Sequence, residues 1–237
     1  REYDHWRELG NTGWGYDDLL PHFKRLESYT QGDARWRGHD GPIGVTSLAN
    51  DPQPLGTAFV QSCVDAGIPA TPDYNGQQYE GVSYLQLNTK GGQRCSSARG
   101  YLEDALPAGL NLLTEAQATR IVFEGQRAVG VEFQHQGRPT SARARAEVIL
   151  SAGPIKSPQL LELSGVGQGA RLQALGVGLV AELPGVGENL LDHVQCRITF
   201  EASQRVTLNE VVSSPLRQAL MGARYLMTRR GMMATPS

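Results

Sequence analysis

The sequence predicts a mixed α/β fold, in which helices and strands follow one another along the chain. Three observations support this class. Amphipathic helical stretches lie near residues 17–28 and 54–66, a strand-rich stretch covers residues 111–134, and an apolar β-branched run at 147–152 precedes a leucine-rich helical stretch. No internal repeat or low-complexity tract interrupts this pattern, so we expect globular domain structure.

The amino-acid composition of the chain limits the kinds of molecule that it is expected to bind. The chain has 237 residues, is 40% hydrophobic and 19% charged, and carries a net charge of -2, which argues against binding to nucleic acid or an anionic membrane. No apolar run is long enough for a membrane span and no signal peptide is evident, so we expect a cytoplasmic protein. Three widely spaced cysteines, Cys63, Cys95 and Cys196, argue against a disulfide framework, and with scattered histidines they predict no metal site.

The first half of the chain predicts two helices joined by long loops. Asp17 or Asp18 can cap the first helix, which should run to about Ser28. Pro54 should open the second helix and Gly67 should end it. A short strand is expected within residues 84–87.

Residues 111–134 predict an antiparallel meander. The strand candidates are 112–114, 120–123 and 129–133, and residues 124–127 form a hairpin-like turn between the last two. The chain should then enter a mostly parallel sheet through a buried strand at 147–152.

The segment that follows this strand has the features of an anion site. Gly153 allows a tight turn with the backbone close to a ligand. Ser157, followed by Pro158, suits the N-cap of a helix that Ser164 and Gly165 would end. A helix N-terminus at a strand end favours an anion, and this geometry suits a pyrophosphate-bearing cofactor.

A glycine-rich stretch at 165–170 fits the Gly-x-Gly-x-x-Ala form of a dinucleotide fingerprint. It follows a helical pattern, however, whereas the fingerprint must follow a strand. We therefore interpret it as a helix end and the start of another helix at 170–175, which Gly176 should end.

The segment 153–167 resembles the second signature of the glucose–methanol–choline (GMC) family of FAD-dependent oxidoreductases, and it meets the constrained positions of that signature. An unrelated strand–loop–helix is the alternative. Further segments resemble the same family, so that the resemblance runs from residue 3 to about residue 233: 3–23, 73–82, 94–102 and 184–193.

The resemblance implies part of an FAD-binding, Rossmann-like domain with an inserted meander, followed by the start of a substrate domain. It predicts a loop- and helix-rich segment at 1–95, FAD-domain sequence at 96–193 and substrate-domain sequence at 194–237. The family's Gly-x-Gly-x-x-Gly motif and its catalytic histidine would lie outside this chain. We therefore expect an internal fragment that is inactive by itself.

Site residues follow from the resemblance one at a time. Backbone groups of Ala118 should contact the adenine, and Ala152 and Gly153 should approach the ADP part of FAD, with Ser151 and Ser157 as second choices. Ala118 could equally be an ordinary strand residue, and Ser157 only an N-cap. No catalytic residue is assigned, because Asp192 and His193 should instead brace the loop that leaves the FAD domain.

The expected activity is that of a choline- or other alcohol-dehydrogenase-like enzyme, with hydride transfer from a small-molecule alcohol to flavin N5. The electron acceptor is left open between oxygen, a quinone and another carrier. A hydroxynitrile lyase that keeps FAD without net redox is one alternative, and a non-catalytic flavoprotein-derived binding module is the other.

Overall fold

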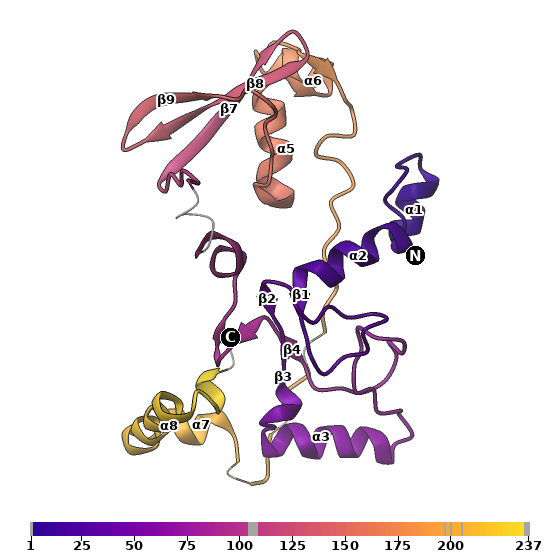
Figure 1. Ribbon diagram of the computed structural model, residues 1–237, viewed down its shortest axis with the longest axis vertical. Coiled ribbons are helices and arrows are strands. Elements are labelled where there is room, and N and C mark those ends of the chain that lie inside the picture. The colour runs from indigo at the N-terminus through magenta and orange to yellow at the C-terminus, as the bar shows by residue number, and fades with distance from the viewer. Residues whose placement is uncertain (1, 104–108, 197, 200, 205, 235–237) are drawn as a thin grey trace. The chain divides into compact units, whose positions relative to one another are not determined.

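The computed structural model describes residues 2–103, 109–196, 198–199, 201–204 and 206–234. The chain divides into two compact units (Figure 1). Unit 1 comprises Arg1–Leu110 and Thr199–Ser237, and unit 2 comprises Asn111–Ile198. The predicted domain boundaries near residues 95 and 193 concern the domains of the family fold and stay a prediction.

Unit 1 holds helices joined by long loops and very short strands. The α-helices are α1 (Glu2–Glu8), α2 (Tyr16–Leu26), α3 (Pro54–Asp65), α7 (Leu208–Val212) and α8 (Pro215–Thr228). Single turns of tighter or wider helix are η1 (Leu48–Asn50), η2 (Ala98–Leu102) and η3 (Met232–Ala234). The strands pair as β1 (Glu27–Ser28) with β2 (Ile43–Gly44), β3 (Thr46–Ser47) with β4 (Gln86–Leu87), and β5 (Thr89–Lys90) with β6 (Gln93–Arg94).

The two predicted helices of the first half are confirmed as α2 and α3. Gly67, which follows α3, has a φ of 86°, as expected for a glycine that ends a helix. The cap of α2 differs from the prediction. Gly15 is the N-cap, and its N–H donates to the Asp18 carboxylate at 3.0 Å, so Asp18 caps the helix from its first turn.

A buried ion network organises the loops of unit 1. The Arg37 side chain is only 3% exposed and donates two hydrogen bonds to Glu27, at 2.7 and 2.8 Å, and one to Asp73 at 2.6 Å. Its guanidinium also lies 4.3 Å from the Tyr29 ring centroid. Burial alone would lower the pKa of Arg37, but the hydrogen bonds and charge of Glu27 outweigh it, and the pKa is raised.

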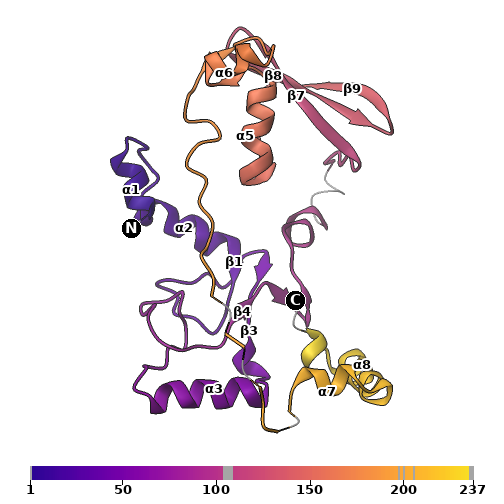
Figure 2. The ribbon, with the colours of Figure 1, turned by 180° about the vertical axis from the view of Figure 1, so that it is seen from behind.

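Unit 2 is built on a three-stranded antiparallel meander. Its strands are β7 (Ala116–Glu124), β8 (Arg127–His135) and β9 (Arg138–Arg143), in the order β7-β8-β9. The other elements are α5 (Gly153–Leu163), β10 (Val166–Gly167), α6 (Gly169–Ala174) and β11 (Ala181–Glu182). The opposite views show α5 beside the meander (Figure 2). Buried residues from the meander, α5, β10 and α6 form the core: Ile121, Val129, Phe133, Leu160, Val166 and Leu172.

The predicted hairpin of the meander is confirmed, with its turn at Gly125, whose φ is 61°. The third strand is not at 112–114. It is β9, which follows β8 directly and pairs with it from His135–Arg138 to Gly130–Arg143. The difference arises because a tight turn at Gly137 reverses the chain directly after β8, so that β9 is the next segment able to pair with it.

The strand predicted at 147–152 does not form within the described residues. These residues are assigned to no strand, and the paired parallel strands that the structure describes are two residues long. A strand is held by its ladder of hydrogen bonds, so an apolar β-branched run is not sufficient for one. The mostly parallel sheet is therefore wrong for these residues, although the mixed fold class is confirmed.

Candidate functional site

The candidate site centres on the backbone that enters α5. Gly153 opens the helix with a φ of 84°, in the left-handed region that favours glycine. A Cβ built on Gly153 would meet nothing within 4 Å, so the backbone there is open to an approaching group. The dipole and free N–H groups of a helix N-terminus favour an anion. The turn therefore fits the pyrophosphate-bearing part of a dinucleotide.

Ser157 lies inside α5 and is not its N-cap, which corrects the prediction. Ala152 is the N-cap, and Pro154 occupies the first turn. The helix begins earlier than expected because Gly153 supplies the turn and Pro154 has a φ already suited to a helix. The Ser157 Oγ instead accepts a hydrogen bond from the Ala152 N–H at 3.1 Å. Ser151, the remaining candidate of this segment, is exposed.

Helix α5 is attached to β7 near its C-terminal end. The Ile121 N–H donates to the Ser164 Oγ at 2.8 Å, and that hydroxyl donates to the Leu160 carbonyl at 2.5 Å. Ser164 is the C-cap of α5, and Gly165 follows with a φ of 86°. The predicted helix end is confirmed. The linking role of Ser164 was missed, because sequence reasoning treated it only as a stop signal.

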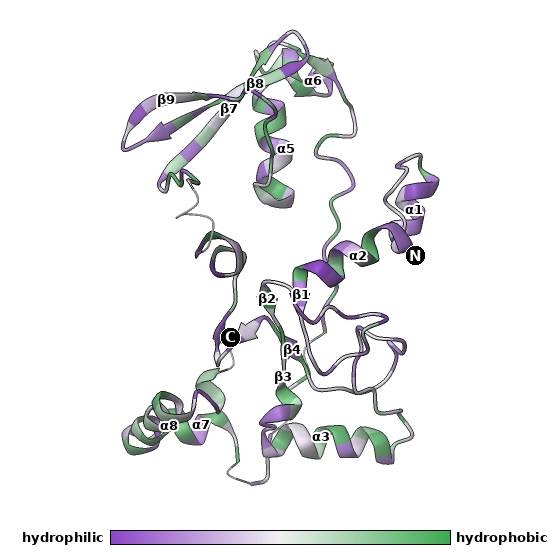
Figure 3. Cartoon of the chain, viewed as in Figure 1, coloured by the Kyte–Doolittle hydropathy of each residue, from purple (hydrophilic) through white to green (hydrophobic). Residues whose placement is uncertain are grey.

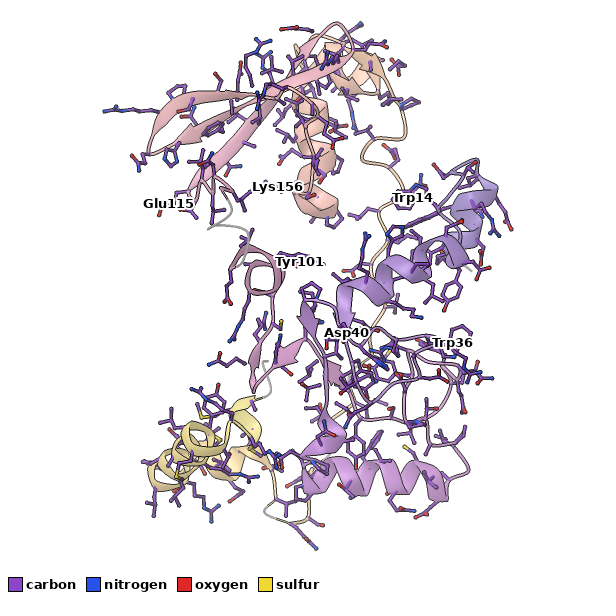
Figure 4. All side chains as sticks on the ribbon, in the orientation of Figure 1. Trp14, Trp36, Asp40, Tyr101, Glu115 and Lys156 are labelled. Atoms are coloured by element: carbon purple, nitrogen blue, oxygen red, sulfur yellow. The ribbon has the colours of Figure 1, made fainter. Side chains whose placement is uncertain are left out.

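Ala118 lies on β7, half-buried and paired with Phe133 of β8. It precedes Ile121 by about 10 Å along the strand, and Gly153 precedes Ser164 by about 16 Å along the helix. Figure 4 shows Glu115 and Lys156, which lie near the starts of β7 and α5, toward the same end of unit 2. The starts of these two elements thus lie toward the same end of the unit.

A second opening lies beside α5 in unit 2. A cavity of about 520 Å³ is lined by one side of α5 and by the loop that includes Gly187 and Asn189. Both loop residues have positive φ, 81° and 57°. At the cavity wall, Arg171 of α6 pairs with Glu162 of α5. This loop lies in the 184–193 segment noted in the sequence, but its contact with α5 could not be inferred from local pattern.

Asp192 and His193 do not form a catalytic pair in this structure. Their side chains are 99% and 93% exposed, and the Asp192 Oδ1 lies 3.7 Å from the His193 Nδ1. A general base needs a fixed position near the proton that it removes, which such exposure does not supply. Among the described residues, no cluster of three or more metal-ligating side chains occurs.

Unit 1 has a larger cavity of its own, about 1100 Å³ in volume. It lies among β3, β4, the start of α3 and the α7–α8 segment, and apolar side chains such as Leu55, Leu87 and Met221 line it. The sequence offered no motif for this cavity, because its walls come from segments far apart along the chain.

The elements of unit 2 and the open Gly153 turn are compatible with the dinucleotide-binding class of protein that the sequence predicts, and comparison with known proteins identifies the family. The family model described as "GMC oxidoreductase" matches residues 1–195. The chain therefore belongs to the GMC oxidoreductase family, as the segment 153–167 predicted.

Named relatives agree with this assignment. An oxygen-dependent choline dehydrogenase of Brucella anthropi is 42% identical over 235 residues, which cover 99% of this chain and 42% of that protein. The mitochondrial choline dehydrogenase of Homo sapiens is 41% identical over 236 residues, covering 99% of this chain and 39% of that protein. The chain thus spans about two fifths of the length of the curated relatives that it matches.

Solved structures share the fold. An FAD-dependent oxidoreductase from Chaetomium thermophilum matches 98% of this chain and 43% of its own, with a TM-score of 0.84 and 24% sequence identity. Pyridoxine 4-oxidase from Mesorbium loti matches 77% of this chain and 36% of its own, with a TM-score of 0.70 and 30% identity. This likeness covers both the helical and the strand elements described above.

Proposed function

We propose that the full-length protein containing this chain is an FAD-dependent oxidoreductase that oxidises the CH–OH group of a small-molecule alcohol. The observation that carries the proposal is the open turn at Gly153, where a helix begins beside a backbone that a ligand can approach. Membership of the GMC family and the choline dehydrogenases among the relatives support it.

The residues of this chain bind and orient the cofactor. The Ala152–Gly153 backbone would hold the ADP part, whose negative charge the α5 dipole would favour. The Ala118 backbone would contact the adenine from β7. The flavin would supply the hydride-accepting N5 atom, and the protein would supply position and electrostatics.

Choline is the first alcohol to test, because the choline dehydrogenases of Brucella anthropi and Homo sapiens match nearly the whole chain. The electron acceptor is not specified by any residue described here. No helix of the described residues is long and apolar enough to cross a membrane. The cytoplasmic location stays a prediction.

Anaerobic reduction of the bound flavin tests the proposal. The full-length protein is purified with FAD, and its visible absorption is followed on addition of choline. We expect loss of the oxidised-flavin band with choline and no change with tetramethylammonium, which has the cationic group but no hydroxyl.

The alternatives give different spectra. A hydroxynitrile lyase-like protein would bind FAD, remain oxidised with every alcohol and cleave a cyanohydrin. A binding module derived from a flavoprotein would show neither reaction. Flavin that no alcohol reduces would contradict the proposed oxidoreductase.

A further inference from the structure

The entry to α5 contains a hydrogen bond that regular helix geometry does not require. The Ala152 N–H donates to the Ser157 Oγ at 3.1 Å. Ala152 precedes the first helical residue, whereas Ser157 is half-buried and lies one turn inside the helix. The bond therefore closes a ring that contains the four residues 153–156, including Gly153 and Pro154.

This ring removes the main freedom of the turn. Pro154 has a nearly fixed φ, so rotation there is already restricted. Gly153 has a φ of 84° and no Cβ to limit it, and glycine visits many other conformations readily. The bond orients the peptide that joins Ser151 to Ala152, whose N–H is the donor, and it closes a ring that contains the Ala152–Gly153 peptide, so the conformations open to that peptide are fewer.

We propose that Ser157 is a positioning residue for the cofactor, which acts through the Ala152 N–H and does not itself touch FAD. This inference rests on the proposed function, since it concerns the orientation of the backbone offered to the ADP part. The Ser157 hydroxyl is engaged as an acceptor by the protein's own backbone. Its contribution is a turn already shaped before FAD arrives, which lowers the ordering cost of binding.

The test compares three variants of the full-length protein: Ser157→Ala, Ser157→Thr and Ser62→Ala. Ser62 is the matched control, because its exposed hydroxyl donates to the Ala58 carbonyl at 2.9 Å in α3, in the other unit. Apoprotein is titrated with FAD, and quenching of flavin fluorescence gives the Kd. Residue-resolved amide exchange reports the Ala152 N–H.

We expect Ser157→Ala to raise the Kd for FAD about threefold to tenfold, the usual range for one lost hydrogen bond. Its Ala152 amide should exchange faster than in the wild-type protein. Ser157→Thr keeps a hydroxyl and should restore both the Kd and the protection. Ser62→Ala should leave both unchanged.

Several results would overturn the inference. One is an unchanged Kd in Ser157→Ala, including the case in which only the melting temperature falls. Another is failure of Ser157→Thr to restore the affinity. Rapid exchange of the Ala152 amide in the wild-type protein would also overturn the inference, because it would show that the hydrogen bond to Ser157 is not maintained. Wild-type protein that binds no FAD would contradict the proposed function as well, whereas wild-type binding with an unaffected Ser157→Ala contradicts this inference alone.

Discussion

At the scale of single residues, the proposed cofactor site depends on the backbone conformation at Gly153. Its φ of 84° is costly for residues with a Cβ, and the space beside it is open. A side chain at this position would therefore cause backbone strain without a steric clash. The sequence predicted the glycine's role from the strand–glycine–helix pattern, although the strand itself is not formed.

We expect Gly153→Ala to destabilise the full-length protein by about 1–2 kcal/mol, the usual cost of the left-handed region for alanine. Relief of that strain would turn the Ala152–Gly153 peptide, so the Kd for FAD should also rise. Gly178→Ala is the control, because Gly178 is exposed, has no positive φ, and a Cβ there meets nothing within 4 Å. Urea unfolding and FAD titration measure the two effects; equal stability of both variants would contradict the assigned strain.

At Arg37 the side chain, and not the backbone conformation, is expected to determine the effect of a substitution on stability. Arg37→Ala leaves the mostly buried Glu27 and Asp73 carboxylates without their cation, so we expect a loss of about 3–5 kcal/mol. Arg35→Ala removes an exposed pair with Asp33, 2.6 Å long, and should cost much less than Arg37→Ala because solvent screens the exposed charges. Urea unfolding of both variants provides the comparison, and similar losses would refute a central role for Arg37.

At the scale of elements, the contact of α5 with β7 fixes the position of one proposed cofactor-binding segment relative to the other. These segments are the Ala152–Gly153 turn and Ala118. The two elements are joined by a hydrogen bond, in which the backbone N–H of Ile121 in β7 donates to the side-chain Oγ of Ser164 at the end of α5. Apolar packing of Leu160 and Ile121 supports it. Packing alone is not directional, so the hydrogen bond is needed to specify the position of the helix along the strand.

Ser164→Ala should leave the buried Ile121 N–H without its acceptor, at a cost of about 1–3 kcal/mol. Amide exchange at Ile121 should rise more than at the neighbouring meander residues. Ser213→Ala is the control, because its hydroxyl makes only a long, exposed bond of 3.3 Å to the Glu210 carbonyl. Unchanged protection of Ile121 would show that packing suffices.

At the scale of the whole molecule, much apolar surface is open to solvent. Figure 3 shows hydrophobic residues along α8, among which Leu216, Leu220, Leu226 and Met227 are each at least 61% exposed. Residues of this kind are normally covered by another element or a partner. The 237 residues therefore present more apolar surface than a stable monomer usually does.

We expect residues 1–237, expressed alone, to aggregate and to show no alcohol-dependent reduction of flavin. The exposed apolar residues favour association, and the nearly fully exposed Asp192 and His193 lack the fixed position that a general base needs. Size-exclusion chromatography with light scattering measures the association, and flavin absorbance measures binding and reduction. A monomeric, flavin-loaded preparation that turns over choline would refute this expectation.

The sequence by itself determined the family, the mixed fold class, the helices α2 and α3, and the hairpin of β7 and β8. Each depends on signals that are local, such as Pro54 opening a helix, Gly125 turning a hairpin and Gly165 ending α5. Caps, turns and periodicity act over a few residues, so they can be recognised without knowing the rest of the fold.

Only the tertiary structure decided the features that depend on distant partners. Arg37 and Asp73 are 36 residues apart, and Ile121 and Ser164 are 43 residues apart, so no local pattern predicts either bond. The run at 147–152 has strand-forming residues but no paired neighbour in the described part of the chain, and it stays unpaired. Local preference proposes an element, but its hydrogen-bonding partner in space determines whether that element forms.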